Sequence, residues 1–179
     1  FAVDFLKKNK LGKKEFLIGI NPAGNWPLRR WPSEYWGILA DRLINEYSAR
    51  VVITGSPNDA ALAMDIKNQM RSVPMVTCGI FNLKQFAALC KRLELFISAD
   101  TGPLHIANAM GTKRIVAVFG PTSPLVTGPY PLNNAVILQK KVGCKIPCYH
   151  LGCKDNRCMK AVSPQDVIEA VRQMMREAQ

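Results

Sequence analysis

Short apolar runs alternate with amphipathic stretches along most of this 179-residue chain. Such alternation is typical of a parallel β-sheet whose strands are linked by helices. Most of the runs are almost continuously apolar, as expected for strands that are covered on both faces. The expected strands are 16–21, 51–55, 75–78, 95–99, 114–119 and 135–139. The sequence therefore predicts an α/β fold built on a parallel sheet covered by helices.

Apolar residues recur at helical spacing between the expected strands. The longest stripe consists of Trp36, Leu39, Ala40, Leu43, Ile44 and Tyr47. Shorter stripes consist of Leu62, Ile66 and Met70; of Leu83, Phe86, Ala87 and Cys90; of Ile106, Ala107 and Met110; and of Val167, Ile168, Val171 and Met174. Each stripe is expected to be the buried face of one helix. Asn82 and Ser163 stand where helix N-caps are expected, and Gly111 where a helix is expected to end.

The composition is that of a globular protein. Hydrophobic residues make up 48% of the chain and charged residues 21%, which excludes a disordered chain. The length suits one compact domain, and no apolar run approaches the roughly 20 residues of a membrane helix. No export signal is visible, which favours the cytoplasm. Because the chain opens with Phe1, we expect a piece of a longer protein, with residues 1–14 a linker or the tail of a preceding helix and 15–179 the domain.

The chain is strongly basic, with 24 Lys and Arg against 13 Asp and Glu and a net charge of +11. This charge fits an anionic partner: nucleic acid, a small molecule that carries phosphate, or an acidic membrane surface. No nucleic-acid recognition motif is present, and the aromatic residues are not interleaved with arginines. We therefore expect no nucleic acid, and a phosphate on a small molecule or lipid instead. A merely solvated basic surface is the alternative.

The chemistry of an open parallel sheet is expected beyond the carboxyl ends of its strands. There, Asp100 ends an expected strand, and Thr101 and Gly102 lead into a helix. Free backbone amides, the Thr101 hydroxyl and the helix dipole together make an anion site, which Gly102 leaves accessible. Asp100 would accept hydrogen bonds from sugar hydroxyls nearby. The alternative is that Asp100 or Thr101 merely caps the helix.

Four further residues lie in or near such loops. Arg29 and Arg30 follow the first strand and could bind a diphosphate through their forks of donors. Asp59 closes a capping-box pattern that begins at Ser56, so a structural role competes with a binding role. His105, in the first turn of the helix after Gly102, is more often structural than catalytic in such a place. The sequence contains no G-x-G-x-x-G fingerprint, phosphate loop, nucleophile elbow or D-x-D pair, so a diphosphate leaving group would be stabilised by arginine and amides rather than by metal.

Four of the six cysteines lie close together, at Cys144, Cys148, Cys153 and Cys158, among lysines and an arginine. Thiolates at these positions could bind zinc or an iron–sulfur cluster, although known structural sites use tighter pairs. Disulfides and reduced thiols are the other possibilities, and metal is not the favoured one. Cys78 and Cys90 are expected in the core.

The stretch 97–107 (ISADTGPLHIA), with Ala-Met-Gly at 109–111 and FGPTSP at 119–124, resembles the hallmark of the ADP-heptose:lipopolysaccharide heptosyltransferases, glycosyltransferase family 9. Three segments before it fit the family pattern in order, at 21–24, 29–32 and 55–59. The resemblance covers nearly the whole chain. It implies a two-domain GT-B enzyme, of which this chain is similar to the C-terminal half, a three-layer Rossmann-like sheet that binds the nucleotide-sugar donor.

The resemblance also implies roles for individual residues. Asp100 would contact the heptose, and Thr101 and Gly102 the diphosphate. Arg29 stands where the family commonly has a lysine that faces the donor phosphates, and would stabilise the leaving group. Asp59 would lie near the ribose. The remaining residues of the implied donor site are Phe81, beside the adenine, and Leu104 and His105.

The implied reaction is an inverting, metal-independent transfer from ADP-heptose to the lipopolysaccharide inner core, with no cofactor. The catalytic base and the acceptor site belong to the N-terminal half of such enzymes, so the isolated chain is expected to bind the donor without appreciable transfer. The basic surface also fits peripheral contact with the inner face of the bacterial inner membrane. The alternatives are a nucleotide-binding module without transferase activity, a transferase for another nucleotide sugar, and a metal-dependent nucleic-acid or partner module in the Cys-rich segment.

Overall fold

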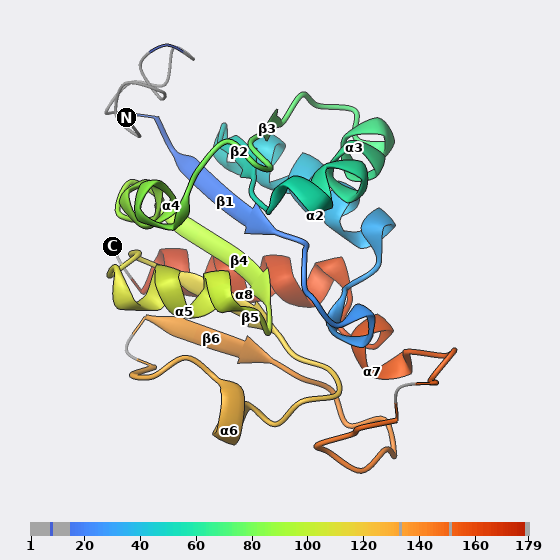
Figure 1. Ribbon diagram of the computed structural model, residues 1–179. Coiled ribbons are helices and arrows are strands. Elements are labelled where there is room, and N and C mark those ends of the chain that lie inside the picture. The colour runs from blue at the N-terminus through green and yellow to red at the C-terminus, as the bar shows by residue number, and fades with distance from the viewer. Residues whose placement is uncertain (1–7, 9–14, 133, 151, 178–179) are drawn as a thin grey trace.

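Six parallel strands form a single sheet in the computed structural model, which describes residue 8 and residues 15–132, 134–150 and 152–177 (Figure 1). The strand order is β3-β2-β1-β4-β5-β6. The strands are β1 (Leu17–Asn21), β2 (Arg50–Ile53), β3 (Met75–Val76), β4 (Leu95–Ala99), β5 (Ile115–Val118) and β6 (Ala135–Leu138). All six strands expected from the sequence are confirmed, with differences of one or two residues at their ends. The expected linker at 1–14 lies outside the described residues apart from Lys8.

The two central strands show why the apolar runs are almost continuous. β1 pairs with β2 on one side and with β4 on the other, and every residue of β1 and β4 is buried. Strands at the middle of a parallel sheet are covered on both faces, so neither face tolerates a regular polar alternation. At the edge of the sheet, β6 is only partly buried.

Helices cover both faces of the sheet and make three layers. On one face lie α2 (Ser33–Tyr47), α3 (Ala60–Gln69) and α8 (Pro164–Arg176), which share a hydrophobic core with Ile18, Val51 and Ile97. On the other face α4 (Leu83–Cys90) and α5 (Gly102–Ala109) pack against Phe96 and Ile115. The described part of the chain also contains two single-turn α-helices, α6 (Pro124–Thr127) and α7 (Arg157–Lys160), and two short 3-10 helices, η1 (Pro27–Arg29) and η2 (Pro57–Asp59).

The ends of the helices follow the local sequence. Asn82 caps α4 through a reciprocal box with Gln85, and Ser163 caps α8 in the same way with Asp166. Gly111 ends α5 with a φ of +69°, a left-handed conformation that favours glycine. None of the described helices combines the length and apolarity that a membrane crossing requires.

Two expectations about the core are corrected. Leu83 was expected on the buried stripe of α4, but as the first residue of this helix it is 74% exposed, and the buried residues are Phe86, Leu89 and Cys90. Cys90 is fully buried as expected, whereas Cys78 follows the short strand β3 and is only partly buried.

The strand order also determines where a ligand can bind. The chain runs outward from β1 to β2 and β3, and then returns to β4 on the other side of β1. The loops that follow β1 and β4 therefore leave in opposite directions and open a crevice between them. Ligands of doubly wound sheets bind at such a switch point, at the carboxyl ends of the strands.

Candidate functional site

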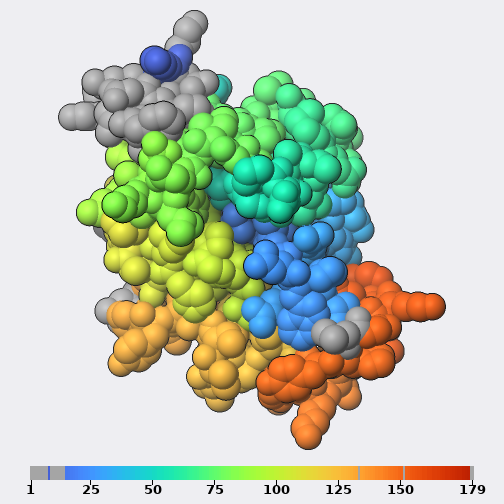
Figure 2. Space-filling view, viewed as in Figure 1, coloured from blue at the N-terminus to red at the C-terminus, as the bar shows by residue number. Residues whose placement is uncertain are grey.

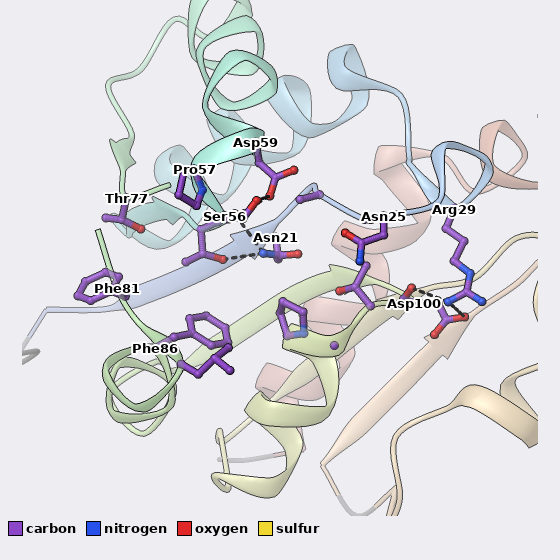
Figure 3. Close-up of a pocket in the computed structure, with 18 of the residues that line it drawn as sticks. Asn21, Asn25, Arg29, Ser56, Pro57, Asp59, Thr77, Phe81, Phe86 and Asp100 are labelled. Atoms are coloured by element: carbon purple, nitrogen blue, oxygen red, sulfur yellow. Dashed lines mark hydrogen bonds and ion pairs between the residues drawn. The ribbon is translucent and has the colours of Figure 1, made fainter. Parts of the chain in front are cut away.

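A cleft of about 750 Å³ opens at this switch point (Figure 3). Four loops, each after a strand of the sheet, form its walls. The lining residues are, in chain order, Asn21, Ala23, Gly24, Asn25, Trp26, Arg29, Thr54, Gly55, Ser56, Pro57, Asp59, Thr77, Phe81, Asn82, Leu83, Phe86, Asp100, Thr101, Gly102 and Pro103.

The N-terminus of α5 forms part of one wall of the cleft. Thr101 is the N-cap residue, but its side chain makes no capping hydrogen bond and lies instead 3.1 Å from the Ser98 hydroxyl. An ideal Cβ at Gly102 would meet no atom within 4 Å, so the backbone there is open to the cleft. Pro103 has no amide hydrogen and the Leu104 amide donates to the Thr101 carbonyl at 3.1 Å, so the amides of Thr101 and Gly102 are the ones that can face an anion. The helix dipole adds a partial positive charge. This wall can therefore bind an anion.

Asp100 lies beside that helix end with its side chain only 3% exposed. Its Oδ2 accepts a hydrogen bond of 2.9 Å from the Thr127 hydroxyl and lies 3.2 Å from Nη1 of Arg29. Arg29 is further placed by Trp26, whose ring centroid is 5.1 Å from the guanidinium carbon. Burial of a carboxylate is costly unless it is paired and hydrogen-bonded, as it is here. Asp100 is thus an oriented hydrogen-bond acceptor at the polar end of the cleft (Figure 3).

Asp59 lies on the opposite wall, after β2. Its Oδ2 accepts hydrogen bonds from the backbone amide and the hydroxyl of Ser56, at 2.8 and 2.6 Å. The capping box read from the sequence is therefore present, and the same carboxylate also lines the cleft. Burial and the nearby Asp59 charge raise the pKa of Cys78, behind this loop, to about 11. Asp59 therefore combines a structural contact with a position from which its carboxylate can reach a ligand.

The other end of the cleft is apolar. Phe81 and Phe86 lie there, across from Pro57 and Thr77 in the close-up view (Figure 3). The exposed Leu83, at the start of α4, lines the same end. An aromatic and aliphatic wall of this kind accepts a flat ring. The cleft therefore runs from an apolar end at α4 to a charged end at Arg29 and Asp100.

The structure brings together six of the eight site residues expected from the sequence. Arg29, Asp59, Phe81, Asp100, Thr101 and Gly102 all line the cleft. Leu104 is fully buried under α5, and His105 is exposed on that helix, so neither of them lines it. Of the residues that were not expected at the site, Leu83 lines the cleft and Thr127 binds Asp100 from outside it. Leu83 could have been found from its place directly after the Asn82 cap, whereas no sequence signal connects Thr127 with Asp100.

The four clustered cysteines surround a second, smaller cavity of about 100 Å³, next to Leu28 and Arg157. All four are free thiols, and burial raises the pKa of Cys158. Among the residues that the structure describes, no group of three or more His, Cys, Asp or Glu side chains is arranged to hold a metal ion.

Comparison with known proteins agrees with this geometry. The family described as "Glycosyltransferase family 9 (heptosyltransferase)" matches residues 4–158. The lipooligosaccharide heptosyltransferase 2 of Campylobacter jejuni subsp. jejuni serotype O:6 is 30% identical over 172 residues, which are 92% of this chain and 52% of that protein. The chain thus spans about half the length of the curated relatives that it matches.

Solved structures share the fold. A family 9 glycosyl transferase from Veillonella parvula DSM 2008 superposes with a TM-score of 0.88 at 29% identity, covering 98% of this chain and 50% of that one. The E. coli heptosyltransferase WaaC, solved with ADP, has a TM-score of 0.73 at 19% identity, covering 97% of this chain and 48% of that one. With ADP-2-deoxy-2-fluoro heptose bound, WaaC has a TM-score of 0.68 at 18% identity, covering 89% of this chain and 43% of that one. The matched segment, the parallel sheet and the cleft at its switch point together show that this chain belongs to glycosyltransferase family 9, the heptosyltransferase family.

Proposed function

We propose that this chain is the donor-binding half of an inverting glycosyltransferase. The enzyme would transfer a sugar from a nucleoside diphosphate to the lipopolysaccharide inner core, and its family points to ADP-heptose as the donor. One observation carries the proposal: an open helix N-terminus and a buried, oriented carboxylate lie side by side in the same cleft. The first is suited to a diphosphate and the second to a polyhydroxylated sugar.

The two ends of the cleft support an orientation for the donor. The diphosphate would lie against the amides at Thr101 and Gly102, with the sugar hydroxyls donating to Asp100. The base would lie at the apolar end beside Phe81, and the ribose near Asp59. The structures of E. coli WaaC with ADP and with ADP-2-deoxy-2-fluoro heptose concern a protein of the same fold, and they support a nucleotide sugar as the ligand.

The part of the reaction that this half supplies is departure of the nucleoside diphosphate. As an acceptor hydroxyl attacks the anomeric carbon, the bond from that carbon to the diphosphate breaks and negative charge grows on the departing oxygen. Amides at the start of α5 and the Arg29 guanidinium are fixed before the reaction, so they stabilise that charge without reorganising. Since the sequence offers no D-x-D pair, we propose that this stabilisation needs no divalent ion. The base that takes the acceptor proton, and the acceptor site itself, would come from the N-terminal half of the enzyme.

Calorimetric titration of the chain with ADP and with ADP-heptose tests the donor site. We expect ADP-heptose to bind more tightly than ADP, and Asp100→Ala to weaken ADP-heptose binding by about tenfold to a hundredfold, because hydrogen bonds to a charged acceptor are lost. ADP binding should change less, since the variant also frees Arg29. Asp65→Ala, on the exposed side of α3, removes the same charge outside the cleft and should change neither affinity.

Equal affinity for ADP and ADP-heptose, unaffected by Asp100→Ala, would contradict a sugar site and favour a plain nucleotide-binding module. Tighter binding of a UDP-sugar would instead indicate a transferase for another donor. In a turnover assay with ADP-heptose and a lipid A–core acceptor, the chain alone should release no ADP above background. Robust transfer would contradict its assignment as a half-enzyme.

We further propose that the complete enzyme works in the cytoplasm, at the inner face of the inner membrane.

A further inference from the structure

A long stretch outside the cleft carries positive charge without any acidic residue. Residues 101–154 contain six Lys and Arg and no Asp or Glu. Three of these cations pair with acids from other segments: Lys113 and Arg114 with Glu94, and Lys140 with Asp166. The three others, Lys141, Lys145 and Lys154, are exposed and make no ion pair within the described part of the chain.

The same stretch holds most of the strongly exposed apolar side chains. Among the described residues, five large apolar or aromatic side chains are more than three-quarters exposed, and four of them lie between 125 and 149. They are Leu125 at 98%, Val126 at 79%, Tyr130 at 92% and Tyr149 at 76%. Scattered apolar residues are normal on a protein surface, but a group of this exposure indicates contact with another apolar phase.

The loop at 120–122, directly before α6, is hydrogen-bonded to the segment that follows β6. The Cys148 amide donates to the Pro121 carbonyl at 2.7 Å, and the Gln139 side chain donates to the carbonyls of Gly120 and Thr122. In the ribbon view, α6 and the loops after β6 extend beyond the sheet edge that β6 forms (Figure 1). In the space-filling view they form the lower rim of the molecule (Figure 2). We call residues 124–132 together with 139–150 and 152–154 the β6-edge surface.

We propose that the β6-edge surface docks on an anionic lipid bilayer. Leu125, Val126 and Tyr130 would enter the headgroup region, while Lys141 and Lys145 would lie against lipid phosphates. Apolar and aromatic side chains flanked by lysines are the combination that binds the interface of an acidic leaflet. This inference rests on the proposed function, which places the acceptor at the inner membrane. It adds which face of the protein contacts that membrane.

Charge complementarity favours lipid over a protein partner. Protein interfaces are depleted of lysine, whereas the exposed cations of this surface are all lysines, which keep their charge in water at the end of a flexible stem. None of its four strongly exposed apolar residues lines the donor cleft. Docking through the β6-edge surface would therefore leave the cleft open to the donor.

Sedimentation with lipid vesicles tests this on the chain itself. Vesicles of phosphatidylcholine with phosphatidylglycerol should bind the chain, and vesicles of phosphatidylcholine alone should bind it at least about tenfold more weakly. Leu125→Ser with Val126→Ser, and separately Lys141→Gln with Lys145→Gln, should each lower the partition coefficient by about tenfold.

Matched controls carry the same changes elsewhere. Val73 is 81% exposed in the loop that leads to the opposite edge strand β3, and Lys84 and Lys91 are exposed at α4. Val73→Ser and the pair Lys84→Gln with Lys91→Gln should lower binding by less than threefold, roughly. An equal loss in the lysine control would show attraction by net charge only, and an equal loss in Val73→Ser would show that apolar contact is not confined to the β6-edge surface. Either result would overturn the proposal, as would an absence of vesicle binding by the unchanged chain.

ADP affinity, measured on the same variants, separates this proposal from the proposed function. Retained ADP binding with no effect of the β6-edge changes on vesicle binding would overturn the docking surface alone. Vesicle binding that responds as expected in a chain without affinity for ADP or ADP-heptose would support the surface and contradict the donor site.

Discussion

Asp100 shows how far a single residue can be read from a sequence. Its place at the end of a strand and before a Thr-Gly pair predicts a loop at the carboxyl edge of the sheet, and the structure confirms that place. Its partners could not be predicted, because Arg29 and Thr127 are 71 and 27 residues away along the chain. Contacts at such separations depend on the order of the strands, which local patterns do not contain.

Thr127 is expected to position the Asp100 carboxylate. Thr127→Val removes the hydroxyl that donates to Oδ2 while keeping the shape of the side chain, and leaves Arg29 to pull the carboxylate toward itself. ADP-heptose affinity should fall about tenfold and ADP affinity should stay nearly constant, as measured by calorimetry. Thr127→Ser restores the donor and should restore affinity. An equal loss for both ligands, or no rescue by serine, would assign Thr127 to stability alone.

At the scale of elements, the two ends of α5 have different roles: one is suited to ligand binding and the other to ending the helix. Its first residue, Gly102, has open space where a side chain would be, whereas Gly111, just past its last turn, has a positive φ. The sequence predicts roles for both glycines: Gly102 lets a phosphate come close to the backbone, and Gly111 ends the helix. Only the backbone angles show that the second requires glycine for conformational reasons.

Alanine at these two positions should therefore have opposite effects. Gly111→Ala should lower the free energy of unfolding by about 1–2 kcal/mol, because a Cβ disfavours the left-handed conformation, and should leave ADP affinity unchanged. Gly102→Ala should leave stability unchanged within about 0.5 kcal/mol but weaken ADP binding at least about tenfold, since a methyl group would hold the phosphate away from the amides. Urea unfolding and calorimetry measure the two quantities. A shared effect of both substitutions would contradict this division of roles.

The start of α8 makes stability depend on acid pH. Burial opposes ionisation of Asp166, but hydrogen bonds from Lys140 and Ser163 outweigh it and hold the pKa of this carboxyl below its ordinary value of 3.8. A carboxyl with a lower pKa in the folded state stabilises the protein above the unfolded-state pKa, and the contribution is lost as the pH falls through the folded-state pKa.

Asp166→Asn should consequently lower the free energy of unfolding at neutral pH and flatten its decline below about pH 4, as followed by urea unfolding at a series of pH values. Asp65→Asn, which removes the same charge from an exposed position on α3, is the control variant. A variant with an unaltered slope would show that the contacts of Asp166 do not contribute to acid sensitivity.

At the scale of the whole molecule, the layers were predictable and the cleft was predictable only in part. Among the residues that the structure describes, apolar runs and helical stripes predict every strand and the five longer helices, because both depend on local periodicity. The strand order places the switch point between β1 and β4, where the predicted Asp100 and Arg29 meet. The apolar end at Leu83 and the tie to Thr127 emerge only from the packing of separate elements.

A crystal structure of the chain with ADP-heptose bound tests the central claim most directly. The account predicts that the diphosphate oxygens lie within hydrogen-bond distance of the backbone amides at the start of α5, with the heptose hydroxyls at Asp100 and the adenine beside Phe81. A diphosphate located elsewhere in the molecule, with the N-terminus of α5 covered by side chains, would contradict it.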